Sequence, residues 1–458
     1  MLRGIPASSG QGLAEAVVVE SGSTDPNLVG NKEVILICSS LTPHQASTLN
    51  PKLVKGVLCE GGGRASHTSI IIRNLEIPAI MGCKGCTGFF SNGDMVFVDG
   101  SKGKAFAVTT ESDLSLLQDR IVECRKMRAE LIAGLSKSAI TLDGKEIPLY
   151  ANVGHLDDLK LVDRYGADGI GYFRTEFLFL MEKKVPDEDM QFEIYRKTVE
   201  QLNGKPVYFK TFDIGADNDV SFLKLPKEAN PFLGWRGIRI CLEERQLFKA
   251  QLRALFRASA YGNLKILVPM ISSVTELRTV KLIVDEVKLE LEQEGVDFDG
   301  GTEIGIVVEV PSAALCAESI IMEADFFTIG TNDLTQYTLA VDRTNEKVSG
   351  YYDFFNPAVL KLVKMTIDAS HAHGKSTIMC GESAGDPVAT LLLLGLGLDR
   401  FSMGPSALPK VKKVICSVSA SYAEDIARTA MKMDTGQEIR QFLEGKLEEI
   451  GLADIVEL

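Results

Sequence analysis

Gly305-Ile306-Val307-Val308-Glu309 and Phe326-Phe327-Thr328-Ile329-Gly330 are two short apolar runs, and each has the length of a buried strand. The segment between them has its apolar residues at the spacing of a helix. Alternation of short apolar strands with amphipathic helices is typical of a parallel sheet covered by helices. These two units therefore predict an α/β fold for this part of the chain.

The same alternation extends outward from these runs, beginning at about Ile140. An eighth strand, with a weaker pattern, is predicted near residues 234–238. Eight β/α units over some 300 residues favour a (β/α)₈ barrel, the TIM barrel. The five remaining predicted strands are 148–153, 169–174, 206–210, 264–270 and 376–380.

Polar and charged residues follow the predicted strands at their carboxyl ends, which is where a (β/α)₈ barrel carries its chemistry. Arginines, a lysine, carboxylates and a thiol would converge on one face, as binding of a polyanion together with a divalent metal requires. The residues are Asn152, Arg174, Glu176, Lys210, Asp213, Arg236, Arg239, Glu309, Asn332, Asp333, Cys380 and Glu382.

Glu309 and Asp333 are the predicted metal ligands, because Mg²⁺ takes one or two carboxylates and fills its other positions with water and phosphate oxygens. The carbonyl of Asn332 could assist them. Cys380 ends a predicted strand beside a glycine, so its thiol is a candidate proton donor or acceptor.

Three arginines are predicted to bind the phosphate and carboxylate oxygens of the anion through paired N–H groups. Any one of them, taken alone, could instead form an ordinary surface ion pair. They are Arg174, Arg236 and Arg343.

The N-terminal part of the chain contains Glu60-Gly61-Gly62-Gly63-Arg64-Ala65-Ser66-His67, followed by an apolar run with helical spacing. The glycines permit a sharp bend, which predicts that His67 lies where a loop becomes a helix. A neutral imidazole there could accept a phosphoryl group, with helix N–H groups and Arg64 near the added charge. The alternative is a glycine turn whose histidine merely packs or caps the helix.

Composition changes along the chain predict three regions. Residues 1–110 read as a compact α+β domain around the histidine loop, opening with a β hairpin that turns near Gly10. Residues 111–138 read as a connecting helix, and residues 139–458 as the barrel.

The net charge of −13 argues against nucleic acid or an anionic membrane as the main partner. No apolar run approaches the length of a membrane helix and no secretion signal is evident, so we expect a cytoplasmic protein. The nine cysteines show no disulfide-type clustering. Cys83 and Cys86 form a C-x-x-C pair, but no second pair or nearby histidine completes a zinc set.

Six stretches together closely resemble Enzyme I of the sugar phosphotransferase system, a family of phosphoenolpyruvate-dependent phosphotransferases. The likeness runs from about residue 30 to the C-terminus, and the first 20 residues match the family's opening strands. The six stretches are residues 60–73, 172–179, 230–236, 330–337, 341–343 and 379–382.

This resemblance implies that phosphoenolpyruvate binds with Mg²⁺ at the barrel mouth and that its phosphoryl group passes to His67 on a swivelling domain. It implies substrate contacts from Arg174, Arg236, Asn332 and Arg343, and metal binding by Glu309 and Asp333. Cys380 would protonate the enolate carbon to give pyruvate. A homodimer formed through the barrel is also implied.

Two departures from the family pattern bear on function. The family inserts a helical domain that docks a histidine phosphocarrier protein, and here only about residues 21–32 are present at that point. The family's Arg-Thr-x-Asp-Ile-Gly-Gly-Asp-Lys stretch has Lys210 at its first position and Asn218 at its last. We expect a weaker grip on the substrate phosphate, or a modified substrate.

Three hypotheses follow. The first is an Mg²⁺-dependent phosphotransferase that phosphorylates His67 and then an acceptor protein. The second keeps this chemistry but passes the phosphoryl group to a small molecule, another carrier or a separate nucleotide-binding subunit. The third is a regulatory protein that senses phosphoenolpyruvate without turnover, suggested by Lys210 and Asn218.

Overall fold

The computed structural model describes residues 1–19, 32–63, 67–154, 156–181, 185–215, 228–345 and 347–456. The chain divides into two compact units, Met1–Gly134 with Asp454–Leu458, and Leu135–Ala453. The helix expected to connect two domains is present as α4 (Glu111–Ala133), and it belongs to the first unit. Among the described residues, no helix is both long enough and apolar enough to cross a membrane.

The N-terminal unit is built on one eight-stranded sheet with the order β1-β8-β7-β3-β4-β5-β6-β2. Strands β3, β4, β5 and β6 run parallel to their neighbours in that series, and the other pairings are antiparallel. The strands are β1 (Leu2–Arg3), β2 (Ile5–Ser8), β3 (Gln11–Val19), β4 (Val34–Cys38), β5 (Val54–Cys59), β6 (Ala79–Met81), β7 (Met95–Asp99) and β8 (Lys104–Ala107).

The prediction of an N-terminal hairpin was wrong. A turn does occur at Gly10, whose φ is +113°, but β2 pairs with β6 and β3 pairs with β4 and β7. The two strands diverge because both partners of β3, the parallel β4 and the antiparallel β7, come from later in the chain. The local apolar pattern could not show this.

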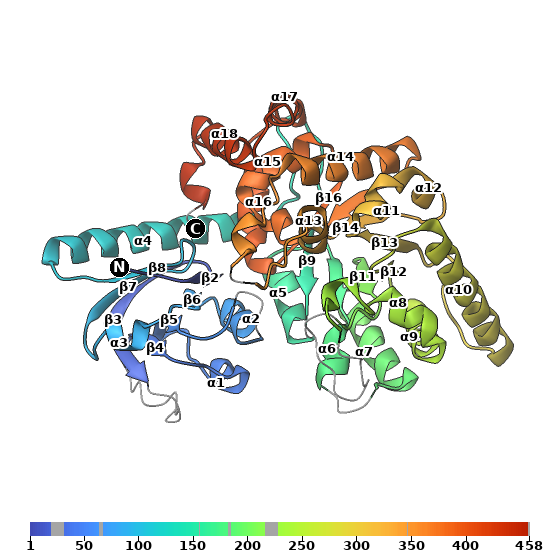
Figure 1. The fold of residues 1–458 in the computed structure, drawn as a ribbon, viewed down its shortest axis with the longest axis horizontal. Coiled ribbons are helices and arrows are strands. Elements are labelled where there is room, and N and C mark those ends of the chain that lie inside the picture. Colours follow the sequence, from blue (N-terminus) through green and yellow to red (C-terminus); the bar gives the residue numbers. More distant parts are fainter. Residues whose placement is uncertain are drawn as a thin grey trace. The chain divides into compact units, whose positions relative to one another are not determined.

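Helices cover both faces of this sheet. Helices α1 (Pro43–Ser47) and α2 (His67–Asn74) close an apolar layer against one face of β4 and β5. The other face packs against α3 (Cys86–Phe89) and Phe90. Helix α4 (Glu111–Ala133) lies along β3, β7 and β8, with Leu117 and Ile121 buried against Phe97 (Figure 1).

The second unit is a closed barrel of eight parallel strands, which confirms the predicted fold class. Its closing contact is between β16 and β9, where Phe401 lies opposite Leu149. The strands are β9 (Leu149–Val153), β10 (Ile170–Arg174), β11 (Val207–Lys210), β12 (Leu264–Val268), β13 (Ile304–Val308), β14 (Phe327–Ile329), β15 (Thr377–Met379) and β16 (Arg400–Met403).

Seven of these strands were predicted, but the eighth lies elsewhere. Residues 234–238 contain no strand, since Gly237 has φ +55° and Ile238 begins a helix. The eighth strand is β16, whose sequence Arg-Phe-Ser-Met is too short and too polar to stand out as an apolar run. It is a strand because two neighbouring strands hydrogen-bond to it.

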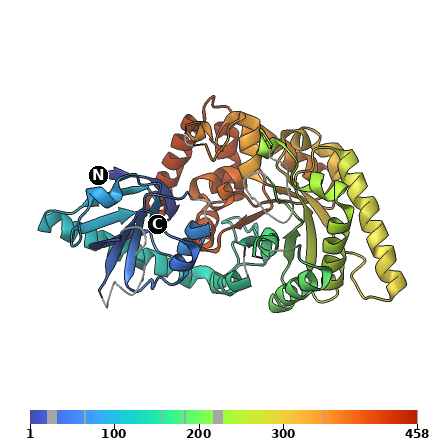
Figure 2. The same ribbon diagram turned by 60° about the horizontal axis from the view of Figure 1, so that its bottom comes forward.

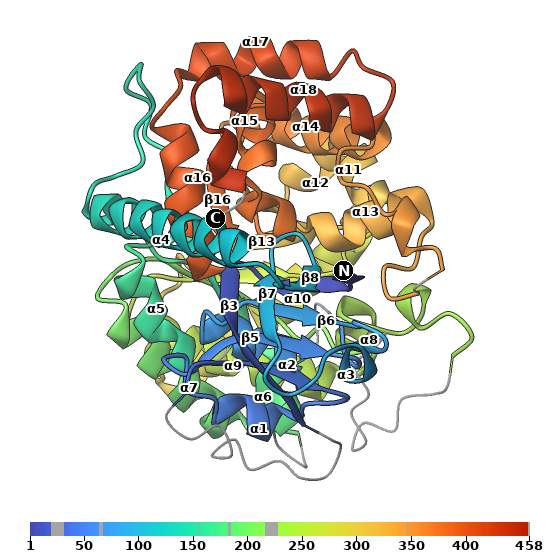
Figure 3. The ribbon, with the colours of Figure 1, turned by 90° about the vertical axis from the view of Figure 1, so that its left-hand side faces the viewer.

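Helices surround the barrel strands, with the long α10 on the outside (Figure 2). The helices α17 and α18 lie side by side over α15, as Figure 3 shows. The helices are α5 (Leu159–Arg164), α6 (Glu176–Met181), α7 (Glu188–Gln201), α8 (Ile238–Glu243), α9 (Arg245–Ser259), α10 (Val274–Glu294), α11 (Pro311–Leu315), α12 (Ala317–Ile321), α13 (Thr331–Leu339), α14 (Pro357–Ala372), α15 (Pro387–Gly395), α16 (Leu408–Ile415), α17 (Ala420–Ala430) and α18 (Gly436–Glu449).

Candidate active site

The carboxyl ends of the barrel strands carry the charged residues that the sequence singled out. Arg174 and Lys210 are the last residues of β10 and β11. Glu309 directly follows β13, and Cys380 directly follows β15. Because all eight strands are parallel and closed into a ring, these ends lie on one face of the barrel.

Arg236 lies at the centre of a buried ion-pair network. Its Nη2 donates to both carboxylate oxygens of Asp213, at 3.2 Å and 3.1 Å, and its Nε donates to Oδ1 of the same residue at 3.3 Å. Its Nη1 donates to Asp333 Oδ1 and to the Tyr337 hydroxyl, both at 3.1 Å. The five N–H groups of the guanidinium thus all have acceptors in this arrangement.

Lys210 is also held between carboxylates. Its Nζ donates to Asp213 Oδ2 at 2.7 Å and forms a second ion pair with Glu176 Oε1. Its burial alone would lower its pKa, but Asp213 and Glu176 outweigh this and raise it, so the amine stays charged. Burial opposes ionisation of Asp213 too, yet Arg236 and Lys210 hold the pKa of that carboxyl well below its usual range.

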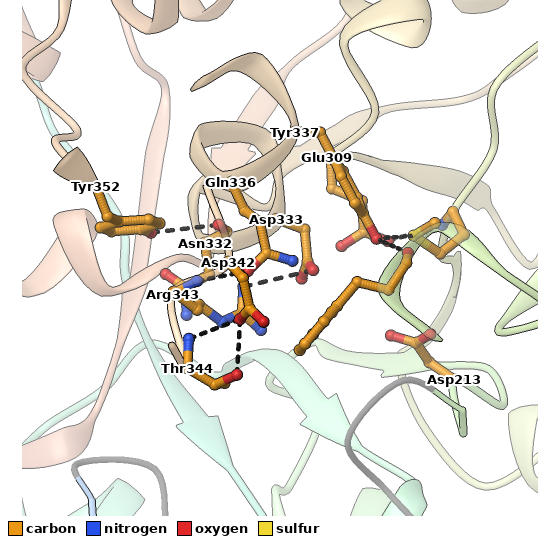
Figure 4. Close-up of polar contacts among 12 residues, drawn as sticks. Asp213, Glu309, Asn332, Asp333, Gln336, Tyr337, Asp342, Arg343, Thr344 and Tyr352 are labelled. Atoms are coloured by element: carbon orange, nitrogen blue, oxygen red, sulfur yellow. Dashed lines mark hydrogen bonds and ion pairs between the residues drawn. The ribbon is translucent and has the colours of Figure 1, made fainter. Parts of the chain in front are cut away.

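Asp333 forms ion pairs with two arginines. Arg343 Nη1 lies 3.4 Å from Asp333 Oδ1 (Figure 4). The same oxygen also accepts from Arg236. Asp333 lies in the first turn of α13, which begins immediately after β14. In the same view, the backbone N–H of Arg343 donates to Gln336 Oε1 at 3.1 Å, which fixes the loop that carries this arginine.

Glu309 is 2 % exposed and accepts a hydrogen bond from the backbone N–H of Met270 at 2.7 Å. Met270 has φ +59°, an unfavourable conformation for a side chain of this size, and such strain is often found at functional sites. Burial, followed by repulsion from Asp333 and Asp213, raises the pKa of Glu309 to about 8. Two carboxylates of this kind, close enough to repel each other, would both gain from a shared cation.

The donor set fits Mg²⁺ bound partly through substrate. Among the described residues, no group of three or more His, Cys, Asp or Glu side chains is arranged to hold a metal by itself. Glu309 and Asp333 are two hard oxygen donors, which is what a site completed by water and phosphate oxygens requires. Gly330 leaves space beside the Glu309 carboxylate, since a Cβ at this position would lie 3.0 Å from Glu309 Oε2.

Cys380 is 6 % exposed, and its thiol lies 3.7 Å from the carbonyl oxygen of Ile329. Burial, with a contribution from the negative charge of Glu309, raises the pKa of the Cys380 thiol, so the sulfur keeps its proton. Asn152 Nδ2 donates to the Cys380 carbonyl at 2.9 Å and fixes the end of this strand. A protonated thiol at a strand end can supply a proton to a reacting carbon.

Arg174 and Asn332 complete the set in the barrel. Arg174 is exposed, and its guanidinium lies over the Tyr172 ring at 5.7 Å. No ion pair to it is found among the described residues, so it is more open to an anion than Arg236. Asn332 Oδ1 accepts from the backbone N–H of Glu382 at 3.1 Å, and this hydrogen bond fixes the orientation of the side-chain amide.

His67 is the first residue of α2, as the prediction of a loop-to-helix junction requires. Thr68 and Ser69 tie the start of this helix to the preceding loops, through Leu41 and Gly63. The side chain of His67 lies outside the described part of the structure, as do Arg64 and Asn218. The structure thus brings the eight predicted barrel residues to one barrel end, and places His67 in the N-terminal unit.

Two residues that hold this site together received no role from the sequence. Asp213 was noted only as a strand-end carboxylate, yet it is the partner shared by Lys210 and Arg236. Tyr337 receives a hydrogen bond from Arg236 and donates one to the Phe232 carbonyl. A signal for Tyr337 was available, because it lies four residues after Asp333 and so on the same face of α13.

Two family models match this chain. The model described as "PEP-utilising enzyme, PEP-binding domain" covers residues 128–420, and the one described as "PEP-utilising enzyme, mobile domain" covers residues 30–103. Together they account for well over half of the chain. It belongs to the PEP-utilising enzyme family.

Relatives in this family support the same assignment. A phosphoenolpyruvate-protein phosphotransferase of Haemophilus influenzae is 47% identical over 413 residues, which are 90% of this chain and 72% of the relative. One of Geobacillus stearothermophilus is 44% identical over 92% of this chain and 72% of the relative, and one of Bacillus subtilis is 42% identical over 92% and 73%. The resemblance drawn from the six motifs is confirmed, and with it the expectation of a transferase.

Proposed function

We propose that this PEP-utilising enzyme transfers the phosphoryl group of phosphoenolpyruvate to His67 and releases pyruvate. One observation carries the proposal: Lys210 and Arg236 pair with Asp213, and Arg236 and Arg343 pair with Asp333, at the barrel end that also carries Glu309 and the protonated thiol of Cys380. This combination suits a substrate that carries a phosphate, a carboxylate and a carbon that must gain a proton.

In the proposed reaction, Arg174, Lys210, Arg236, Asn332 and Arg343 bind the phosphate and carboxylate oxygens. Glu309 and Asp333 would hold Mg²⁺, which supplies positive charge to the phosphate oxygens when it is bound. The phosphoryl group moves from the enol oxygen to an imidazole nitrogen of His67. The Cys380 thiol gives its proton to the enolate carbon, forming the methyl group of pyruvate.

Substrate binding has to exchange partners within the ion-pair network. Every N–H group of Arg236 already has an acceptor on Asp213, Asp333 or Tyr337. A phosphate or carboxylate oxygen of the substrate can therefore be bound by Arg236 only in place of one of these acceptors. Asp333, if it held Mg²⁺, would no longer accept from Arg236, and that N–H group would be free to bind the substrate.

The proposed test uses phosphoenolpyruvate labelled in its phosphate. With Mg²⁺, the wild-type chain should gain acid-labile label and release pyruvate, and His67→Ala should gain none. Label that persists in His67→Ala would refute the proposal. Binding of phosphoenolpyruvate without label or pyruvate would instead favour a sensor, the hypothesis that Lys210 and Asn218 suggested.

We propose further that phospho-His67 passes its phosphoryl group to an acceptor protein or, as the alternative, to a small molecule or a non-standard carrier. Strands β3 and β4 pair in register, Val19 with Cys38, and only residues 20–33 join them. That length cannot contain a helical docking domain, which supports an acceptor other than the family's usual phosphocarrier. Rapid discharge of the phosphoprotein by a histidine phosphocarrier would contradict this.

Two further proposals follow from the family resemblance and the thiols. We infer a homodimer formed through the barrel, which sedimentation equilibrium would detect. The nine cysteines form no disulfide, which supports a reducing compartment such as the cytoplasm.

A further inference from the structure

The N-terminal unit contains four buried cysteines that the proposed reaction does not use. Cys38 and Cys59 end the neighbouring strands β4 and β5 and are register partners. Cys83 and Cys86 follow β6. Each of the four is at most 2 % exposed.

Cys83 and Cys86 share one tight turn. The backbone N–H of Cys86 donates to the Cys83 carbonyl at 3.2 Å, and Gly82 and Gly85 have φ of +62° and +76°. The two residues lie in the same apolar cluster. A turn of this kind brings the Cα atoms within roughly 7 Å, which overlaps the range a disulfide needs.

This turn is also attached to the loop that leads to His67. The backbone N–H of Cys83 donates to the Cys59 carbonyl at 2.9 Å. On the other side of the turn, the N–H and hydroxyl of Thr87 both donate to Glu60 Oε1, at 3.1 Å and 2.5 Å. Glu60 directly precedes Gly61-Gly62-Gly63, so the C-x-x-C turn anchors the base of the glycine loop.

We propose that Cys83 and Cys86 form a reversible dithiol–disulfide site whose oxidation loosens this anchor. A small disulfide such as oxidised glutathione is the oxidant. Two S–H bonds break, one S–S bond forms, and the oxidant takes up two electrons and two protons to leave as two thiols. Drawing the two sulfur atoms to bonding distance changes the first turn of α3 and pulls Thr87 away from Glu60.

Tryptic digestion offers a direct test, because Lys84 lies between the two cysteines. The full chain carrying Cys316→Ser, which removes the exposed thiol, is incubated with oxidised or reduced glutathione, alkylated and digested. Oxidation should join peptides 74–84 and 85–102 through one disulfide, and reduction should separate them. Fully alkylated separate peptides at every ratio, a glutathione adduct only, or a disulfide to Cys59 would overturn the proposal.

The effect on the loop rests on the proposed function and has a separate measurement. Labelling of His67 by phosphoenolpyruvate should be several-fold slower in the oxidised chain, and the double variant Cys83→Ser, Cys86→Ser should not respond to glutathione. An unchanged rate in the joined form would overturn the role of the anchor. If the reduced chain takes no label, the proposed function fails, while the peptide result still decides whether the disulfide forms.

Discussion

At the scale of single residues, Asp213 is the carboxylate that holds two buried cations of the barrel end in place, a role that its position after a strand did not show. It is 6 % exposed and accepts from two cations, Lys210 and Arg236. A buried charge that loses its partner is costly because neither water nor another charge replaces it. The side chain therefore governs both the stability of the barrel mouth and the direction of the two cations.

Replacing Asp213 with asparagine should lower the free energy of unfolding of the barrel by about 3–5 kcal/mol, because two buried cations are left facing fewer carboxylates. Urea denaturation of the full chain measures this. The matched control is Asp189→Asn, since Asp189 pairs with Arg257 but its side chain is 84% exposed. The control should change the stability by less than about 1 kcal/mol. Equal losses of unfolding free energy in the two variants would show that the buried ion pairs stabilise the barrel no more than an exposed ion pair does.

Tyr337→Phe should raise the KM for phosphoenolpyruvate several-fold while kcat changes less. The Tyr337 hydroxyl accepts from Arg236 and donates to the Phe232 carbonyl, so it holds the guanidinium in position. The loss of these hydrogen bonds should cost about 1–3 kcal/mol of stability. Steady-state kinetics under folded conditions separate the two effects. Tyr351→Phe is the control, since that side chain is 73% exposed. A fall in kcat with an unchanged KM would contradict a positioning role in substrate binding.

At the scale of elements, several helices begin at a residue whose side chain accepts one of the free N–H groups of their first turn. An example from outside the helix itself is Asp143, which accepts from the backbone N–H groups of Ala420 and Ser421 at the start of α17, at 2.9 Å and 3.4 Å. The Thr141 hydroxyl donates to the same carboxylate at 2.5 Å. One carboxylate thus joins the 141–145 turn to a helix far along the chain.

The stabilising effect of Asp143 should depend on pH. The hydrogen bond from Thr141, followed by that from the Ala420 N–H, lowers the pKa of Asp143 from 3.8 to about 2. A carboxyl with a lowered pKa in the folded state stabilises the fold above its ordinary pKa, and this contribution is lost as the pH falls toward 2. Thermal unfolding should therefore show a lower Tm for Asp143→Asn than for wild type at pH 6, and a smaller difference at pH 3.

The control for this experiment is Asp434→Asn, because the side chain of this exposed aspartate has no hydrogen bond within the part of the chain that the structure describes. Its Tm should follow that of the wild type at both pH values. A Tm difference between Asp143→Asn and wild type that grows on acidification would refute the stabilising role of the Asp143 carboxylate at the start of α17.

At the scale of the whole molecule, the chain has two compact units with separate cores. Calorimetry of the full chain should therefore resolve two unfolding transitions. In His67→Ala, which removes the proposed phosphoryl acceptor, Mg²⁺ with phosphoenolpyruvate should raise the temperature of the barrel's transition only. Ligand at about 100 times its Kd stabilises the folded state by about 2.7 kcal/mol, which corresponds to a few degrees for a unit of this size.

Glu309→Gln provides the matched control for that measurement. It removes one proposed metal ligand from the barrel, so the ligand-induced shift should shrink while the transition of the N-terminal unit stays in place. If only the transition of the N-terminal unit shifted, the ligand would bind that unit, and the proposed site in the barrel would be refuted.

By itself, the sequence determined the fold class, seven barrel strands, the helix that begins at His67, and the family. These features depend on local patterns, because a strand or a motif is written in a few consecutive residues. It also placed Arg174, Lys210, Glu309 and Cys380 correctly at strand ends, since the end of an apolar run is a local property.

Only the tertiary structure decided which segments pair and which charges meet. It placed β2 and β3 apart, supplied β16 as the eighth strand, joined Asp213 to Arg236, and brought Cys83 and Cys86 under the loop that leads to His67. Each of these depends on contacts between residues far apart in the chain. Their free energy comes from a shared buried environment, and a local run of residues does not contain that information.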